Sequence, residues 1–232
     1  MKKTLALFLV LIMVFSLSAC NNKENNSDEL QEQETQFQQN ELEKLETIID
    51  AEVQNTIDTL CAEFNELSGE IKSFDDYVKN EKKIAQFYKH IDAKTRATFN
   101  GLKEYTLKYA VAIMESDHPT HIKARKLEDL YECLYVSACD KLYDEIYTAL
   151  LEQVLDAFHS GALDEYTIPY EEASEIISID YNNWDDTRSN VKYHYEKATT
   201  FIYNFYYDLS EALSVGDLEK AKSVLDNYRI QL

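Results

Sequence analysis

The amino-acid sequence predicts an all-α protein, an elongated antiparallel bundle of four long helices followed by a short C-terminal helix. The 232 residues include only four glycines and two prolines, and five of these six fall where long amphipathic patterns stop or restart. Between these positions, apolar residues recur at spacings of three and four, which is typical of helices. The short segments between the patterns favour antiparallel neighbours.

The first twenty residues have a different character from the rest. Lys2 and Lys3 precede an apolar run from Leu5 to Phe15, which is the layout of an export signal. This run is shorter than the roughly 20 apolar residues that an uncleaved membrane-spanning helix needs. We therefore expect a signal peptide that is removed from the chain.

The residues Leu17-Ser18-Ala19-Cys20 resemble the lipobox of bacterial lipoproteins. The resemblance implies a signal peptide over residues 1–19 and lipid, as diacylglyceryl and palmitate groups, on Cys20. Cys20 would then tether the chain to the lipid bilayer on the extracytoplasmic face of the cell membrane. The excess of lysine over arginine and the many Tyr and Asn residues favour a Gram-positive source. The alternative is an ordinary signal peptide whose cleavage site happens to precede a cysteine.

Residues 20–40 are predicted to be a disordered tether between the lipid and the folded domain. Only Leu30 and Phe37 are apolar between residues 21 and 40, too few to offset the entropy of ordering the segment.

Residues 41–232 are predicted to form the helical bundle domain. The first pattern runs from Leu42 to Leu67 and stops at Gly69. The second is expected from Phe74 to Glu115, with Ser73 and Asp76 as a capping signal and a kink or short break at Asn100-Gly101. Thr120 is expected to cap a third helix that stops at Gly161. Pro169 is expected to open a fourth helix lasting to Gly216, and Asp217 to cap a short fifth one reaching about Arg229.

The fourth pattern contains two overlapping repeats. A seven-residue spacing gives a coiled-coil-like seam, whose members are Tyr181, Trp184, Arg188, Val191, Tyr195, Ala198, Ile202, Phe205, Leu209 and Ala212. An eleven-residue spacing aligns Trp184 with Tyr195 and Tyr206, and three such units do not decide between the two periods. With the lipobox and the segment Leu142–Tyr147, this stretch resembles uncharacterised small acidic, tyrosine-rich helical lipoproteins of Gram-positive bacteria. Their helices carry Tyr-x-x-Trp-x-Asp-Thr-Arg-Ser repeats. The resemblance implies no activity, and Arg188 is not repeated, since Thr199 and Ser210 take its place.

The candidate contact residues for a ligand or partner are Trp184, Arg188 and Tyr195, because such side chains dominate binding interfaces. The alternative is that these residues pack in the core, where the tyrosine rings would be buried and their hydroxyl groups would reach water. The formal net charge of −20 argues against nucleic acid as a partner, since phosphate binding needs clustered Lys and Arg. An envelope protein, a peptide or a glycan remains as the class of partner. The acidity is compatible with cationic peptides or divalent ions, and the alternative is a charge excess that only solvates the surface.

No catalytic residue, cofactor site or metal site is predicted. Glu115-x-x-His118 and Asp156-x-x-His159 partly match the motif of di-iron bundles but belong to opposite ends of neighbouring helices. His118-x-x-His121 lacks a third zinc ligand. Cys61, Cys133 and Cys139 are expected to be buried free thiols.

These observations predict a non-catalytic, membrane-anchored protein that binds or spaces something in the cell envelope. Two alternatives stay open: a metal-dependent or hydrolytic enzyme built on the bundle, and a homo-oligomeric coiled coil that uses the fourth-helix seam.

Overall fold

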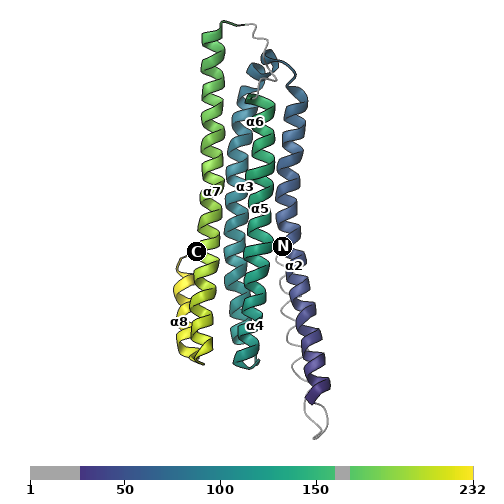
Figure 1. Ribbon diagram of the computed structural model, residues 1–232, viewed down its shortest axis with the longest axis vertical. Helices are drawn as coiled ribbons and strands as arrows, with labels where there is room; N and C mark the ends of the chain where they lie inside the picture. The colour runs from purple at the N-terminus through teal and green to yellow at the C-terminus, as the bar shows by residue number, and fades with distance from the viewer. Residues whose placement is uncertain (1–26, 160–167, 232) are drawn as a thin grey trace, which may run out of the picture. The chain divides into compact units, whose positions relative to one another are not determined.

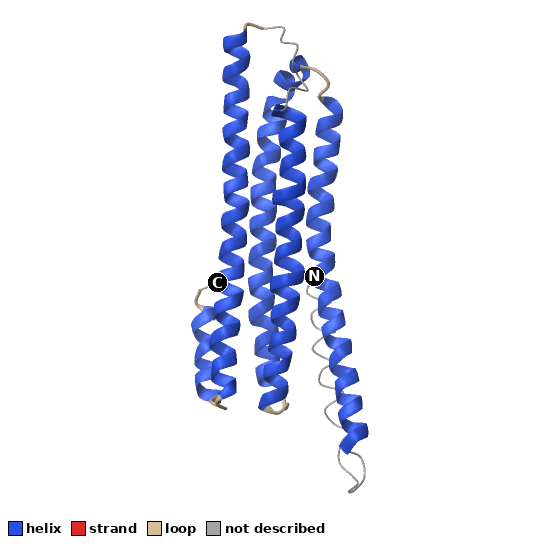
Figure 2. Cartoon of the chain, viewed as in Figure 1, coloured by secondary structure: helices blue, strands red, loops and turns tan. Residues whose placement is uncertain are grey.

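The computed structural model describes the backbone of residues 27–159 and 168–231, and the side chains of residues 44–158 and 168–231. The described part is helical and contains no strand (Figure 2), which confirms the predicted all-α class. The chain divides into two units, Met1–Glu41 and Leu42–Leu232. In the first unit the described residues, from Ser27 onward, are helical, and the second unit is a helical bundle.

Figure 1 shows the helices in chain order. They are α2 (Ser27–Glu70), α3 (Phe74–Glu115), α4 (Thr120–Tyr131), η2 (Glu132–Asp140), α5 (Lys141–Tyr143), η3 (Asp144–Leu150), α6 (Leu151–His159), α7 (Tyr170–Ser214) and α8 (Leu218–Arg229). The segments labelled η are π-helical. Those from α4 to α6 follow one another without a gap, and we call them together the third helix.

The expected disordered tether is wrong for residues 27–40, because α2 begins at Ser27. Glutamate and glutamine make up more than half of this stretch and are good helix formers. Extending a helix that packing already holds also avoids the cost of nucleation. Low apolar content removes the core contacts of a segment, but it does not remove its helix propensity. Residues 20–26 lie outside the described part.

The boundaries of α3 agree with the prediction at both ends. The Ser73 hydroxyl accepts a hydrogen bond from the Asp76 amide at 3.2 Å. The Asp76 carboxylate in turn accepts one from the Lys72 amide at 3.3 Å. The first bond satisfies a donor that the first turn of a helix leaves free, and the second holds the residue before the cap. The Ser73 hydroxyl also donates to the Asp76 carboxylate at 3.0 Å, and this bond lowers the pKa of Asp76. The helix continues through Asn100 and Gly101 without a break.

The third helix is not the uninterrupted α-helix that the sequence predicted, because η2 and η3 are π-helical. Nor does Thr120 cap it: the helix starts at Thr120, after Pro119, with no side-chain hydrogen bond at the cap. A physical reason for the π-helical segments lies in the core stripe, which repeats every four residues from Leu130 to Phe158 without exception. These buried residues are Leu130, Leu134, Ala138, Leu142, Ile146, Leu150, Val154 and Phe158.

An α-helix has 3.6 residues per turn, so a stripe at a spacing of four would drift by about 40° with each step. Over the seven steps from Leu130 to Phe158 the drift would reach about 280° and carry part of the stripe out of the core. Hydrogen bonds from i to i+5 place more residues in each turn. The π-helical segments therefore lower the average winding and keep the stripe on one side. The expected stop at Gly161 lies outside the described residues.

The connection between α7 and α8 follows the predicted chemistry. Gly216 has a φ of 71°, a left-handed conformation that favours glycine. The amides of Gly216 and Asp217 donate to the carbonyls of Leu213 and Ala212, each at 3.0 Å, as in a Schellman ending. The Asp217 carboxylate then accepts from the Lys220 amide at 2.9 Å and caps α8. At the other end, α7 begins at Tyr170, one residue after Pro169.

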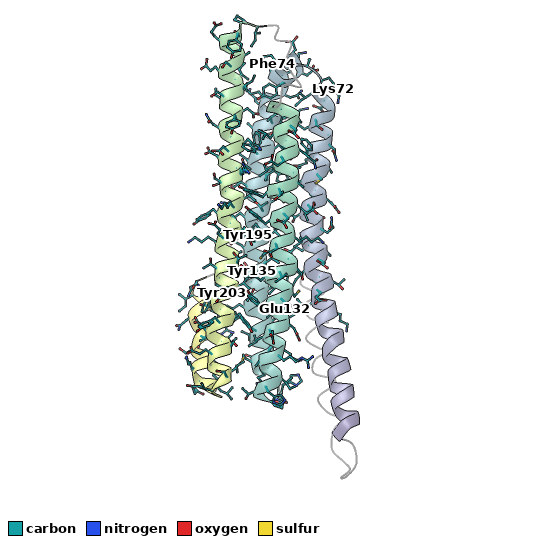
Figure 3. All side chains as sticks on the ribbon, in the orientation of Figure 1. Lys72, Phe74, Glu132, Tyr135, Tyr195 and Tyr203 are labelled. Atoms are coloured by element: carbon teal, nitrogen blue, oxygen red, sulfur yellow. The ribbon has the colours of Figure 1, made fainter. Side chains whose placement is uncertain are left out.

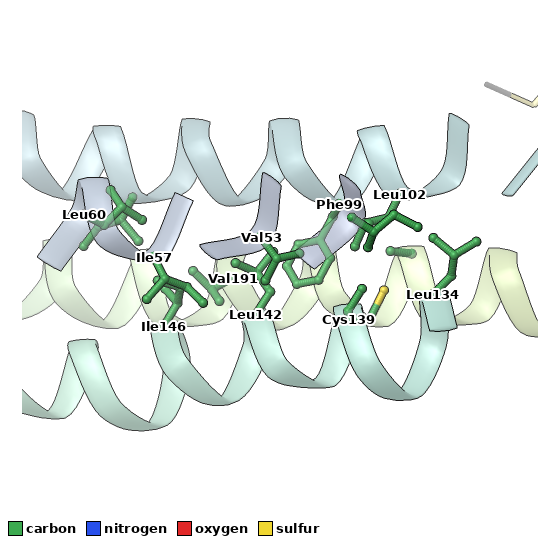
Figure 4. Close-up of a cluster of buried hydrophobic side chains, with 14 of the residues drawn as sticks. Val53, Ile57, Leu60, Phe99, Leu102, Leu134, Cys139, Leu142, Ile146 and Val191 are labelled. Atoms are coloured by element: carbon green, nitrogen blue, oxygen red, sulfur yellow. The ribbon is translucent and has the colours of Figure 1, made fainter. Parts of the chain in front are cut away.

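The core of the second unit lies between α2, α3, the third helix and α7 (Figure 4). Figure 4 labels core residues from all four: Val53, Ile57, Leu60, Phe99, Leu102, Leu134, Cys139, Leu142, Ile146 and Val191. Cys61, Cys133 and Cys139 are free thiols, as predicted, although Cys61 is only half-buried. The C-terminal α8 packs on α7 through Tyr228, whose ring meets the edges of Phe201 and Phe205 at 5.3 and 5.1 Å.

Candidate functional site

Two groups of neighbouring aromatic side chains lie along the junction between the third helix and α7, and we call them together the aromatic ladder; Figure 3 labels Tyr135, Tyr195 and Tyr203 among them. Its members are Tyr131, Tyr135, Tyr143 and Tyr147 from the third helix, and Trp184, Arg188, Tyr195, Tyr203, Tyr206 and Tyr207 from α7. Arg188 belongs to it because its guanidinium stacks on two of the rings.

The tyrosines of the third helix share one face for the same reason as the core stripe. Tyr131, Tyr135, Tyr143 and Tyr147 lie at multiples of four residues, and Cys139 takes the place between the two pairs. Because i to i+5 hydrogen bonds underwind this helix, a four-residue spacing keeps the rings in line. On α7, Trp184, Tyr195 and Tyr206 occupy the eleven-residue spacing found in the sequence.

One end of the ladder is closed around Trp184. The indole is only 2% exposed, and its N–H donates to the Leu151 carbonyl at 2.8 Å. The Arg188 guanidinium lies over the Tyr147 ring at 4.7 Å and the Trp184 ring at 5.1 Å. An Arg188 nitrogen is also 3.5 Å from a Glu152 carboxylate oxygen. Trp184 is therefore a core residue, and its interpretation as a partner contact is corrected.

The middle of the ladder joins the two helices through Tyr195. Its ring stacks on Tyr143 at 4.3 Å, and its hydroxyl donates to Asp140 Oδ1 at 2.8 Å. Burial and this bond to Asp140 raise the pKa of Tyr195. Burial and the neighbouring Tyr147 raise the pKa of Tyr143 to about 12. Both rings are half-buried, so these hydroxyls remain neutral hydrogen-bond donors at ordinary pH.

The other end, which we call the open half, consists of Tyr131, Tyr135, Tyr203, Tyr206 and Tyr207. Tyr131 contacts Tyr206 at 4.6 Å, Tyr135 at 5.2 Å and Tyr203 at 6.4 Å between ring centroids. Tyr203 in turn stacks on Tyr207 at 6.4 Å. Tyr203 and Tyr207 are 49% and 58% exposed. The open half thus presents joined aromatic surface to the outside of the bundle.

The three predicted contact residues, Trp184, Arg188 and Tyr195, all belong to the aromatic ladder. Each of them makes contacts with other residues of the same chain. Arg188 and Tyr195 keep half-exposed edges, whereas Trp184 does not. The open half was not singled out from the sequence. A usable signal was the four-residue spacing of Tyr131, Tyr135, Tyr143 and Tyr147. A four-residue spacing brings these tyrosines onto one face if the helix is underwound. In a regular α-helix the same spacing would spread them around the helix.

The coiled-coil-like seam of α7 packs inside the bundle. Its apolar members are buried against the chain's own helices: Val191, Ala198, Ile202, Phe205, Leu209 and Ala212. A coiled coil between copies would have to expose these residues. In the described part of the chain, the apolar side of this seam is therefore occupied by the chain's own helices.

Three of the described histidines, His90, His118 and His194, each lie against one charged side chain. His90 Nδ1 lies 2.6 Å from Glu63 Oε2, and His194 Nε2 lies 2.9 Å from Asp92 Oδ1. Each pair joins two helices of the bundle. His118 Nε2 is 3.0 Å from the Lys126 ammonium, and the side chain of His159 lies outside the described part. Among described residues, no group of three or more His, Cys, Asp or Glu side chains is arranged to hold a metal ion.

Within the described residues, no helix is both long enough and apolar enough to cross a membrane. Comparison with protein-family models, curated proteins and solved structures finds no match to this chain.

Proposed function

We propose that the chain is a non-catalytic lipoprotein of the cell envelope, anchored through acylated Cys20, whose bundle binds a partner through the open half of the aromatic ladder. The observation that carries the binding role is the joined ring surface of Tyr131, Tyr203, Tyr206 and Tyr207. Tyrosine supplies large apolar area with a polar end, and it is enriched at binding interfaces.

The anchor is supported by the sequence Leu17-Ser18-Ala19-Cys20 after a short apolar run. The acidic chain would be repelled by an anionic bilayer surface, so lipid must provide the attachment. Two acyl chains give stable binding where a single chain is marginal.

Replacing Cys20 tests the anchor. Cys20→Ser is expected to give an unprocessed or released protein that keeps its helical fold, because the bundle begins well after the lipobox. Fractionation of cells and an intact mass of the purified chain measure both effects. Normal cleavage together with unchanged membrane retention would contradict the lipid anchor.

Site-directed photo-cross-linking tests the binding role. A photoreactive phenylalanine at Tyr203 is expected to capture a discrete partner in intact cells. The matched control is the same residue at Tyr193, which lies on the same helix and is 54% exposed. The ring of Tyr193 is already engaged by Lys197 at 5.5 Å. Absence of a product at Tyr203, or the same products at both positions, would contradict binding through the open half.

A further inference from the structure

Arg188 shows how this ladder holds a cation. The guanidinium rests against one ring of the third helix, Tyr147, and one ring of α7, Trp184. A carboxylate of the third helix, Glu152, lies 3.5 Å from one of its nitrogens. We call these three parts, two rings and a carboxylate, the arginine cradle. Stacking on aromatic faces and pairing with a carboxylate are the contacts that a planar guanidinium favours.

A second set of two rings and a carboxylate, equivalent to those of the arginine cradle, occurs further along the aromatic ladder. On α7, Tyr195 lies eleven residues after Trp184. On the third helix, Tyr135 and Asp140 each lie twelve residues before Tyr147 and Glu152. The two helices are antiparallel, so both steps lead in the same direction. Tyr195 and Asp140 meet, since the Tyr195 hydroxyl donates to Asp140 at 2.8 Å.

This second set has no arginine at the position that corresponds to Arg188. Eleven residues after Arg188 stands Thr199, which is buried and donates its hydroxyl to the Tyr195 carbonyl at 2.8 Å. Cation–π contacts of lysine and arginine within the described part fall on Tyr109, Tyr147, Trp184, Tyr193 and Phe201. None falls on a ring of the open half, to which Tyr135 of this second set also belongs.

The Asp140 carboxylate brings a negative charge to this second set. Asp140 acts on both Tyr195 and Tyr131 and helps to raise the pKa of each, after the larger effect of burial. A carboxylate that accepts one hydrogen bond from Tyr195 keeps further lone pairs for another donor. The formal net charge of −20 would attract a cationic partner over a distance and speed its association.

We propose that the second set of parts, Asp140 with Tyr135 and Tyr195, together with the adjoining rings of Tyr131 and Tyr203, binds an arginine side chain of a cationic partner polypeptide. The partner would supply the guanidinium that Arg188 supplies at the closed end. This inference rests on the proposed binding function and names the chemistry of its partner.

The test uses the chain purified from its membrane in a non-ionic detergent and a capped peptide, acetyl-Gly-Arg-Gly-Arg-Gly-amide. The control peptide carries citrulline, which has nearly the shape of arginine without its charge. Calorimetry is expected to show one saturable site for the arginine peptide and at least tenfold weaker binding of the citrulline peptide. The arginine side-chain protons are expected to shift upfield in NMR spectra, because they lie over ring faces.

Matched variants distinguish binding of the peptide at a specific site from its nonspecific attraction to an acidic protein. Asp140→Asn and the exposed Asp144→Asn each remove one negative charge, and asparagine can still accept the Tyr195 hydrogen bond. Asp140→Asn is expected to weaken arginine-peptide binding about tenfold and Asp144→Asn less than twofold. Tyr203→Leu, with Tyr193→Leu as its control, repeats the comparison with exposed side chains that the fold does not need.

No binding of the arginine peptide, or equal losses in Asp140→Asn and Asp144→Asn, would overturn the inference. The same holds for equal affinity of the arginine and citrulline peptides. These outcomes leave the proposed function intact if photo-cross-linking at Tyr203 still captures a partner. Failure of that cross-linking would instead remove the binding role on which the inference rests.

Discussion

At the scale of single residues, Trp184 shows what spacing alone does not predict. An aromatic residue in a helical repeat faces either the core or a partner, and the spacing is the same in both cases. The choice depends on the helix that covers it. Here the Leu151 carbonyl, 33 positions away, receives the indole N–H, a contact that no local pattern encodes.

Replacing Trp184 by phenylalanine tests its role in the core. The variant loses the hydrogen bond to Leu151 and part of the buried volume, so the free energy of unfolding is expected to fall by about 2–3 kcal/mol. Urea unfolding followed by far-ultraviolet circular dichroism measures it, because the variant has no tryptophan. Tyr193→Phe, on the exposed face, is expected to change stability by less than about 0.5 kcal/mol. Equal effects of the two substitutions would contradict the buried position of Trp184.

At the scale of elements, the helix ends were predictable because their causes are local. Ser73, Asp217 and Gly216 act through hydrogen bonds or backbone angles within a few residues of themselves. The boundaries of α3 and α8 follow directly from them. The π-helical segments were missed, although their signal is also in the sequence. An unbroken four-residue spacing of core residues from Leu130 to Phe158 is not compatible with a long straight α-helix.

Two glycines are expected to respond oppositely to alanine. Gly101 lies inside α3, where alanine is favoured by roughly 0.5–1 kcal/mol. An added Cβ would meet only the end of the flexible Glu52 side chain, at 3.1 Å. Gly101→Ala is therefore expected to raise the free energy of unfolding. Gly216→Ala is expected to lower it by about 1–2 kcal/mol, because φ is 71° there.

Urea unfolding at neutral pH measures both glycine variants. Gly69→Ala, where nothing lies within 4 Å of the added Cβ, shows the effect of alanine without a neighbour. If Gly101→Ala destabilised the chain while Gly69→Ala did not, α2 and α3 would have to approach at Gly101 more closely than described.

At the scale of the whole molecule, the fold class and the antiparallel order followed from amphipathic patterns and short connections. The arrangement of side chains between helices did not. Which tyrosines meet depends on the relative rotation of the third helix and α7, and the underwinding of the third helix sets that rotation. The open half therefore emerges only when both helices are in place.

The buried and half-buried tyrosines are expected to make stability depend on alkaline pH. Burial raises the pKa of Tyr143 to about 12, and burial with the hydrogen bond to Asp208 raises that of Tyr228 to about 12. The unfolded value is about 10. Because the folded pKa is higher, the stabilisation is complete below pH 10 and is lost as the pH rises toward 12.

Urea unfolding at a series of pH values, with tyrosinate absorbance as a second observable, measures this dependence. Tyr228→Phe is expected to remove part of the slope above pH 10. Stability that stays constant to pH 12, or tyrosines that all titrate near pH 10, would contradict the burial of these hydroxyls.

Chemical footprinting of the tyrosines tests the central claim, that the open half is a binding face in the cell envelope. Tyrosine nitration, located by mass spectrometry, is compared between intact cells and the purified chain. Tyr203 and Tyr207 are expected to be protected in cells and reactive after purification, while exposed Tyr193 reacts equally in both. Equal nitration of Tyr203 and Tyr207 in the two samples would contradict the claim.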